Sequence, residues 1–163
     1  MFQTGLRTSR VSPRYRKPAM LLAHDSPGNS HADAALLLIR IAAALAFLFH
    51  GCGILFGLFG EPGPAQFAAE MHMPAVIGYL VGLAQVGGAI TILTGILTRL
   101  GAGCILVVML GAIFLVHLPH GFDINKGGIE YPLTQLLIAL ALLFAGAGRY
   151  SLASSLPPWL RKF

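Results

Sequence analysis

Four long apolar stretches, separated by short polar segments, organise this chain of 163 residues. A helix needs roughly 20 apolar residues to cross a bilayer core of about 30 Å. The stretches that approach or exceed this length are residues 34–58, 74–97, 100–118 and 132–148. They predict an all-α membrane protein, built as an antiparallel bundle of four transmembrane helices.

The composition favours a membrane protein over a soluble one. Hydrophobic residues make up 56% of the chain and charged residues 10%, whereas charged residues usually make up about a quarter. Four helices that are apolar on every face would leave a small soluble domain no polar surface. The formal net charge is +5, but no basic stripe or aromatic–basic motif for RNA accompanies it. We therefore expect the lipid bilayer, and no nucleic acid, as a partner.

Lys and Arg concentrate at the two ends of the chain. Five lie in residues 1–32, three lie in residues 149–163, and Arg99 occupies the turn between the second and third stretches. The two longer loops together carry only Lys126. Because cytoplasmic loops are enriched in Lys and Arg, both termini are predicted to lie inside and the two longer loops outside.

The polar segments also divide the chain into three parts. Residues 1–32, rich in Ser, Pro and Arg, predict a disordered basic cytoplasmic tail. Residues 33–152 form the membrane domain, and residues 153–163 form a short cytoplasmic tail. The apolar stretch before the first span is too brief for a signal peptide, so the first span is expected to act as the insertion signal. Met20 is an alternative start codon.

Small residues and two glutamines recur at helical spacing within the spans. Helices in lipid associate through close approach and internal polar contacts. These faces are therefore expected to meet, with each glutamine bonding to a neighbouring helix. They comprise Gly53 and Gly57; Gly78, Gly82, Gln85 and Ala89; and Gln135, Ala139, Leu142 and Gly146.

The first outer loop has a pattern of its own. Residues 63–73 place Phe67 and Met71 four positions apart, beside Glu70 and His72. This spacing indicates a short helix lying in the membrane interface, and a plain loop is the alternative.

Arg40 lies inside the first span, where a charge is costly. It is six residues from the start of the span, roughly 9 Å at 1.5 Å per residue. Its side chain either snorkels to the inner interface or pairs with an internal acceptor or an anionic cofactor head group.

A second polar group gathers at the outer end of the spans. His50 and His117 lie roughly 24 and 26 Å from the inner ends of their helices, hence at one depth. His120, Glu130 and Tyr131 are expected at the same level. Such side chains transfer protons, hydrogen-bond a quinone carbonyl or ligate a metal, and an interfacial polar belt is the alternative. Their spacing matches no recognised metal or haem motif, so we predict no metal site.

The two cysteines are not expected to pair. Cys52 and Cys104 differ in depth by roughly 20 Å, whereas a disulfide needs Cα atoms within about 7 Å.

Several of these segments together resemble the DoxX family of small four-helix membrane proteins. They are LLLIRIAAALAFLFHGCGILFGLFG (36–60), GLAQVGGAITILTGILTRLGA (82–102), FLVHLPHGF (114–122), GGIEYPL (127–133) and GAGRYSL (146–152). Some members of this family resemble membrane subunits of thiosulfate:quinone oxidoreductase, and others are linked to oxidoreductase complexes that handle thiol and oxidative stress. The resemblance implies a role of this kind. The recurring polar positions that carry over are Arg40, His50, His117, His120, Glu130 and Tyr131. Many members have Glu in the second span where this chain has Gln85, and a neutral amide does not exchange a proton.

The resemblance and the outer polar group together predict a function. We expect a multi-pass subunit or accessory of a quinone-linked oxidoreductase system in a bacterial inner membrane. The sequence holds no intrinsic cofactor motif, so quinone is the candidate ligand and an oxidoreductase is the candidate partner. Homo-oligomers are compatible with the small size. The alternatives are an anchor for a soluble enzyme and a small transporter. The candidate site comprises Arg40, His50, Gln85, His117, His120, Glu130 and Tyr131.

Overall fold

A computed structural model describes residues 30–157, and every regular element in that range is a helix. The longer helices are α1 (Ser30–Phe56), α2 (Pro64–Glu70), α3 (Ala75–Thr94), α4 (Thr98–Ala112) and α5 (Glu130–Ala145). Four short segments complete the fold: η2 (Ile113–His117, a π-helix), η3 (Leu118–His120), η4 (Ile124–Lys126) and η5 (Leu152–Ser155). The predicted all-helical class is confirmed. The alternative start codon and most of the predicted basic tail lie outside the described residues. Only residues 30–32 of that tail are described, and they form the start of α1.

Three helical segments of the described range are long and apolar enough to cross a membrane. They are Ser30–Phe56, Ala75–Thr94 and the continuous run Thr98–His120. α5 is apolar but has 16 residues, roughly 24 Å at the α-helical rise. Large apolar side chains cover the outer faces: Leu38, Val107 and Phe144 are 67%, 68% and 74% exposed. Such a surface suits lipid rather than water.

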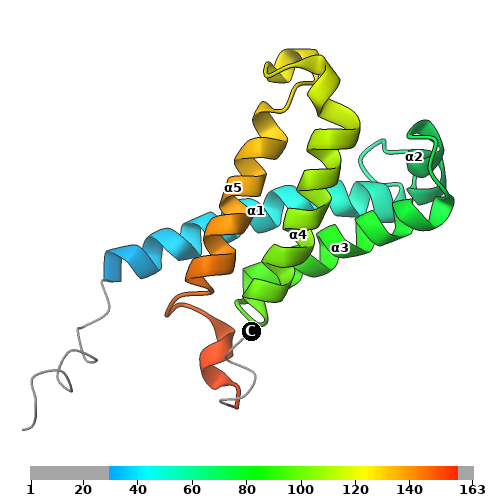
Figure 1. Cartoon of the computed structure of the whole chain (residues 1–163). Coiled ribbons are helices and arrows are strands. Elements are labelled where there is room, and N and C mark those ends of the chain that lie inside the picture. The colour runs from blue at the N-terminus through cyan, green and yellow to red at the C-terminus, as the bar shows by residue number, and fades with distance from the viewer. Residues whose placement is uncertain (1–29, 158–163) are drawn as a thin grey trace, which may run out of the picture.

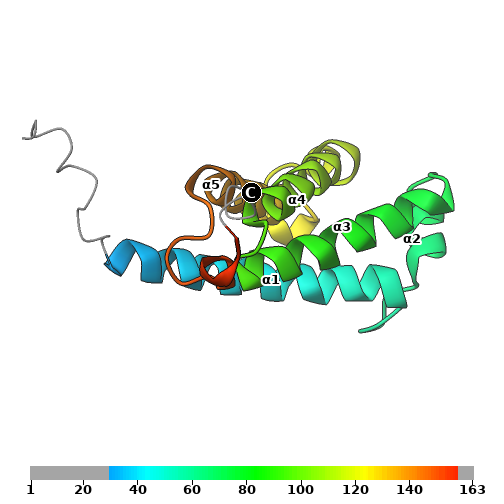
Figure 2. The same cartoon turned by 90° about the horizontal axis from the view of Figure 1, so that it is seen from below.

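The helices form two hairpins that cross each other (Figures 1 and 2). α1 packs along α3, and α4 packs along α5. Figure 1 shows the α4–α5 hairpin standing across the α1–α3 hairpin, with the short helix α2 beside α3 at its far end. The hairpins meet near the turn between α3 and α4 and diverge from there. This arrangement departs from a bundle of four aligned helices.

Glycines set the close contacts between the helices. A Cβ added at Gly82 of α3 would lie 2.9 Å from the Leu55 Cβ and 3.2 Å from its Cα and N, all in α1. One added at Gly88 would lie 2.9 Å from Ile105 and 3.1 Å from the Gly101 carbonyl oxygen, both in α4. One added at Gly78 would collide with the Pro64 carbonyl of α2. The face of α3 that holds Gly78, Gly82, Gln85 and Ala89 is buried, as predicted.

Gly57 does not belong to a helix-packing pair, contrary to expectation. α1 ends at Phe56, and Gly57 follows with φ +66° in an exposed position. Only Gly53 of the predicted pair is buried within the helix. Gly57 instead ends α1, because a left-handed backbone at that position favours glycine.

The small-residue contact between α1 and α3 can be tested with a matched pair of substitutions. Gly82→Ala pushes a methyl group against the α1 backbone and is expected to lower the free energy of unfolding by about 1–3 kcal/mol. Gly87→Ala, where an added Cβ meets nothing within 4 Å, should be neutral or stabilising by about 0.5–1 kcal/mol. Thermal unfolding in detergent compares the two. Equal stabilities would contradict the close approach at Gly82.

Candidate functional site

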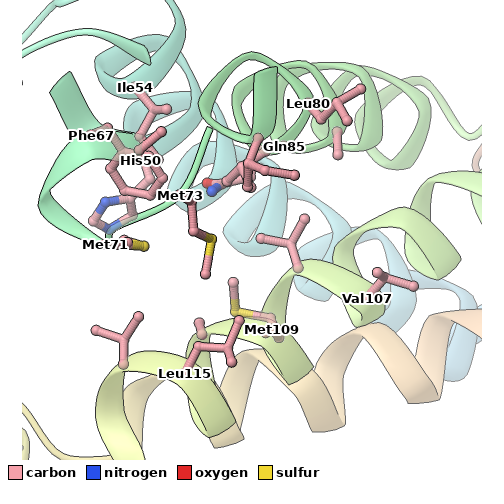
Figure 3. A pocket seen from close by; sticks show the side chains of 18 of the residues that line it. His50, Ile54, Phe67, Met71, Met73, Leu80, Gln85, Val107, Met109 and Leu115 are labelled. Carbon is pink, nitrogen blue, oxygen red and sulfur yellow. The ribbon is translucent and has the colours of Figure 1, made fainter. Parts of the chain in front are cut away.

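A cavity of about 680 Å³ occupies the space where the two hairpins diverge. α1, α2, α3, α4 and the π-helix η2 contribute to its walls, with Tyr131 from the start of α5. Most of the lining is aliphatic, aromatic or thioether: Phe67, Met71, Met73 and Met109 are among the residues that face it (Figure 3). Its size and apolar lining, with a few polar groups, are typical of sites for small organic ligands.

Four of the seven candidate residues line this cavity: His50, Gln85, His117 and Tyr131. They come from four different helical segments. The His50 and Tyr131 rings face each other with centroids 5.9 Å apart and planes tilted by 56°. The side chain of Gln135, one turn further along α5, lies within hydrogen-bonding reach of Tyr131. His50, His117 and Tyr131, which were predicted from helical rise to lie at one depth in the membrane, thus line the same cavity.

We expected Gln85 to hydrogen-bond to a neighbouring helix, and it does not. It is 5% exposed, and it forms no hydrogen bond with any residue in the described range 30–157. A Cβ added at Gly51 of α1 would lie 2.8 Å from the Gln85 Cβ, so α1 approaches the base of this side chain. In Figure 3 the amide points past that contact into the cavity, toward His50 and Met73. The amide borders the cavity, so a ligand there can complete its hydrogen bonds.

His117 ends the π-helix, a local widening that is frequent at functional sites. Its Nδ1 lies 2.6 Å from the Gly127 carbonyl oxygen. Because a carbonyl only accepts, this contact assigns the proton to Nδ1. The neutral ring therefore keeps Nε2 as its unprotonated nitrogen, free to accept a hydrogen bond.

His120 and Glu130 serve the α4–α5 connection and do not line the cavity. His120 Nδ1 donates to the Val116 carbonyl at 3.0 Å, and Glu130 Oε2 accepts from the Ile124 N–H at 3.2 Å. A Cβ added at Gly128 would lie 2.5 Å from the Gly121 carbonyl oxygen, so this turn is closely packed. Within residues 30–157 no three His, Cys, Asp or Glu side chains gather as metal ligands. The considered metal set of His50, His117, His120 and Glu130 is therefore not assembled.

Arg40 is buried away from the cavity, and it pairs with internal acceptors rather than snorkelling. The residue is 1% exposed. Its Nε and Nη2 donate to the Ile92 and Leu93 carbonyls at 2.7 Å, and its Nη1 donates to the Ala147 and Tyr150 carbonyls at 2.8 and 2.7 Å. The first two carbonyls belong to the last turn of α3, where carbonyls lack intrahelical partners. Arg40 is a structural residue that joins α1 to the last turn of α3 and to the segment after α5.

Several residues that line the cavity were missed in the sequence. Phe67 and Met71 were expected to face the interface from a short helix or loop. A helix, α2, does form, but both side chains turn to the cavity. Their four-residue spacing predicted that they share one apolar face. It did not predict which part of the molecule that face contacts. Cys104 also lines the cavity, and both it and Cys52 are free thiols, as their predicted depths required.

The fold and cavity define a helical membrane protein with a ligand-sized, mainly apolar pocket between two hairpins. The DoxX family model matches residues 35–118, and the chain belongs to the DoxX family. It is 32% identical to "Uncharacterized membrane protein Rv3486" of Mycobacterium tuberculosis (strain ATCC 25618 / H37Rv), over 89% of this chain and 90% of that protein. It is 25% identical to "Putative oxidoreductase CatD" of Bacillus subtilis (strain 168), over 73% of this chain and 84% of that protein. No solved structure matches the chain.

The structural role of Arg40 predicts a large loss of stability on its removal. Arg40→Met leaves four carbonyls without their donor, and each unpaired buried group costs about 1–3 kcal/mol. We expect the free energy of unfolding to fall by at least about 3 kcal/mol. Arg99→Met is the control, because Arg99 is exposed and makes one contact of 3.3 Å to the Phe144 carbonyl. Thermal unfolding in detergent measures both, and similar small losses would contradict the assignment.

Proposed function

We propose that this protein is a subunit or accessory of a quinone-linked oxidoreductase system and that a quinone head group binds in the cavity. The observation that carries the proposal is the amide of Gln85, which has no hydrogen-bond partner among the described residues and points into an apolar space of about 680 Å³. A ligand there must be largely apolar and must offer a hydrogen-bonding group to the amide. A quinone ring with its two carbonyl oxygens meets both requirements.

The neighbouring side chains add a second point of contact. The Tyr131 hydroxyl and the His50 ring supply donors on one side of the cavity, 5.9 Å apart by ring centroid. The Gln85 amide supplies both a donor and an acceptor, so it suits a carbonyl and equally the hydroxyl of a reduced ring. His117 holds its proton on Nδ1 toward Gly127 and leaves Nε2 as an acceptor. These residues bind and orient the ring, while the aliphatic walls exclude water.

The electrons of such a system come from outside this chain. Its sequence has no nucleotide-binding loop and no cysteine cluster for iron–sulfur. A relative named as an oxidoreductase supports a redox association, and a separate oxidoreductase partner supplies the electron carrier in this proposal. The sulfur, thiol or oxidative-stress setting comes from the family resemblance.

The proposed topology has four spans, with both termini on the cytoplasmic side of a bacterial inner membrane. The uneven placement of Lys and Arg supports this orientation. α5 would be the fourth span: its 16 residues cover roughly 24 Å, and the turns at either end bring it into the interface. The connection between α4 and α5 then lies on the outer side.

Quinone binding by the purified protein tests the proposed function. A tailless quinone should bind to wild type, and Gln85→Leu should weaken it about tenfold, the loss of roughly one good hydrogen bond. His50→Ala should weaken it by a similar factor. The control is His31→Ala, because His31 is exposed at the start of α1 and does not line the cavity. Equilibrium dialysis gives the affinities. Equal affinities for all variants, or no binding by wild type, would refute the site.

Labelling with a membrane-impermeant maleimide tests the topology. In a background with Cys52 and Cys104 replaced by Ala, a cysteine at Asn125 should react from the outside of intact cells. A cysteine at Ser155 should react only after the membrane is opened, because α5 separates the two positions. Reaction of both from the same side would show that α5 does not cross the bilayer.

A further inference from the structure

The wall of the cavity opposite His50 is apolar and also exposed. Leu80 of α3 and Val107 of α4 both line the cavity, and they are 56% and 68% exposed. Figure 3 shows them on the far side of the cavity from His50, while the Gln85 amide points toward His50. A residue that lines a cavity and is also largely exposed marks an opening. His50 is exposed as well, so the cavity is open on its polar side and also on this apolar side.

The depth of this opening places it in the hydrocarbon part of the bilayer. Val107 lies nine residues after the start of α4, roughly 14 Å along the helix and close to the middle of a core of about 30 Å. Leu80 lies five residues from the start of α3, roughly 8 Å along it. No charged group lies at either position, and a rim facing water would be polar.

The interior behind the opening has room for a chain. A Cβ added at Gly111, which lines the cavity one turn beyond Val107, meets nothing within 4 Å. Cys104, one turn in the other direction, also lines it. Cys104, Val107 and Gly111 share one face of α4 by their helical spacing. Together they form an apolar strip along the open side.

We propose that the cavity opens sideways into the bilayer between Leu80 and Val107, and that the ligand is a long-tailed, membrane-borne quinone whose apolar tail leaves through this opening. The inference rests on the proposed function and specifies its substrate class. The head group stays at Gln85, His50 and Tyr131, and the tail passes the strip on α4 into the lipid. A water-soluble quinone would use only the head-group side.

The test uses the full chain in phosphatidylcholine nanodiscs and two quinones with the same head group, one tailless and one with a decyl tail. Val107→Trp narrows the opening at an exposed position. It should weaken the decyl quinone about tenfold, an obstructed-fit effect, and change the tailless quinone less than about twofold. Leu110→Trp is the matched control on α4, because Leu110 is 37% exposed and does not line the cavity. It should leave both affinities within about twofold.

A second pair of variants and a mapping experiment keep the result independent of folding defects at Val107. Gly111→Leu, which fills open space, should weaken the binding of the decyl quinone more than that of the tailless quinone. Gly103→Leu, where an added Cβ also meets nothing within 4 Å, should change neither affinity. A diazirine at the end of the decyl tail should label α3 and α4 near Leu80 and Val107, as located by mass spectrometry of peptides.

The possible outcomes separate the two proposals. Equal weakening of both quinones by Val107→Trp, or tail labels near His50 and Met71, would overturn the lateral opening while leaving the head-group site intact. Tail labelling that phospholipid displaces but tailless quinone does not would also overturn it, because an acyl chain would then be the occupant. Binding of neither quinone to wild type would refute the site and this inference together.

Discussion

The four hydrogen bonds of Arg40 are the constraint on which the arrangement of the helices depends. A guanidinium within a membrane helix must find acceptors inside the protein, because lipid offers none. It finds them at the Ile92 and Leu93 carbonyls and at the Ala147 and Tyr150 carbonyls, all within 2.8 Å. The first two carbonyls belong to the last turn of α3 and the other two to the segment after α5, so one side chain joins the two hairpins.

The contacts of Arg40 leave the hairpins free to diverge elsewhere, and the cavity forms where they do so. Nearby, Asp33 accepts the Arg149 N–H at 2.9 Å and adds a second contact between α1 and the segment after α5. Away from Arg40, α2 packs against α3 and α1 of its own hairpin, and the His50–Tyr131 contact joins α1 to the start of α5. All three nitrogens of the Arg40 guanidinium donate to carbonyls, whereas the Gln85 amide faces the cavity without a protein partner in the described range. This contrast is the basis for proposing a ligand.

The sequence predicted the helices well, because membrane spans are read from apolar length and little else. The equal depth of His50 and His117 followed from helical rise alone, and both line the cavity. The buried face of α3 followed from the four- and three-residue spacing around Gly82. These features are local or periodic, so they need no knowledge of how the hairpins cross.

Other features depended on tertiary contacts that periodicity does not contain. The acceptors of Arg40 are carbonyls of the last turn of α3 and of the segment after α5, up to 110 residues away. No sequence pattern identifies a carbonyl that lacks a backbone partner. Glu130 was grouped with the cavity residues by depth, yet the backbone of the α4–α5 turn takes up its carboxylate. Gln85 and Gln135 were both expected to bridge helices. The close approach of α1 at Gly51 directs Gln85 past its neighbour. Gln135 lies beside Tyr131 on its own helix, and its Oε1 is buried with no hydrogen-bond partner among the described residues.

The most direct test of the central claim is to identify what the cavity holds in the native membrane. The protein is extracted in mild detergent, and mass spectrometry identifies the small molecules and proteins that copurify. The account predicts a long-tailed quinone in stoichiometric amount with wild type, depleted in Gln85→Leu and retained in Gly87→Ala, together with an oxidoreductase. Phospholipid alone, with the same content in all three proteins, would contradict it.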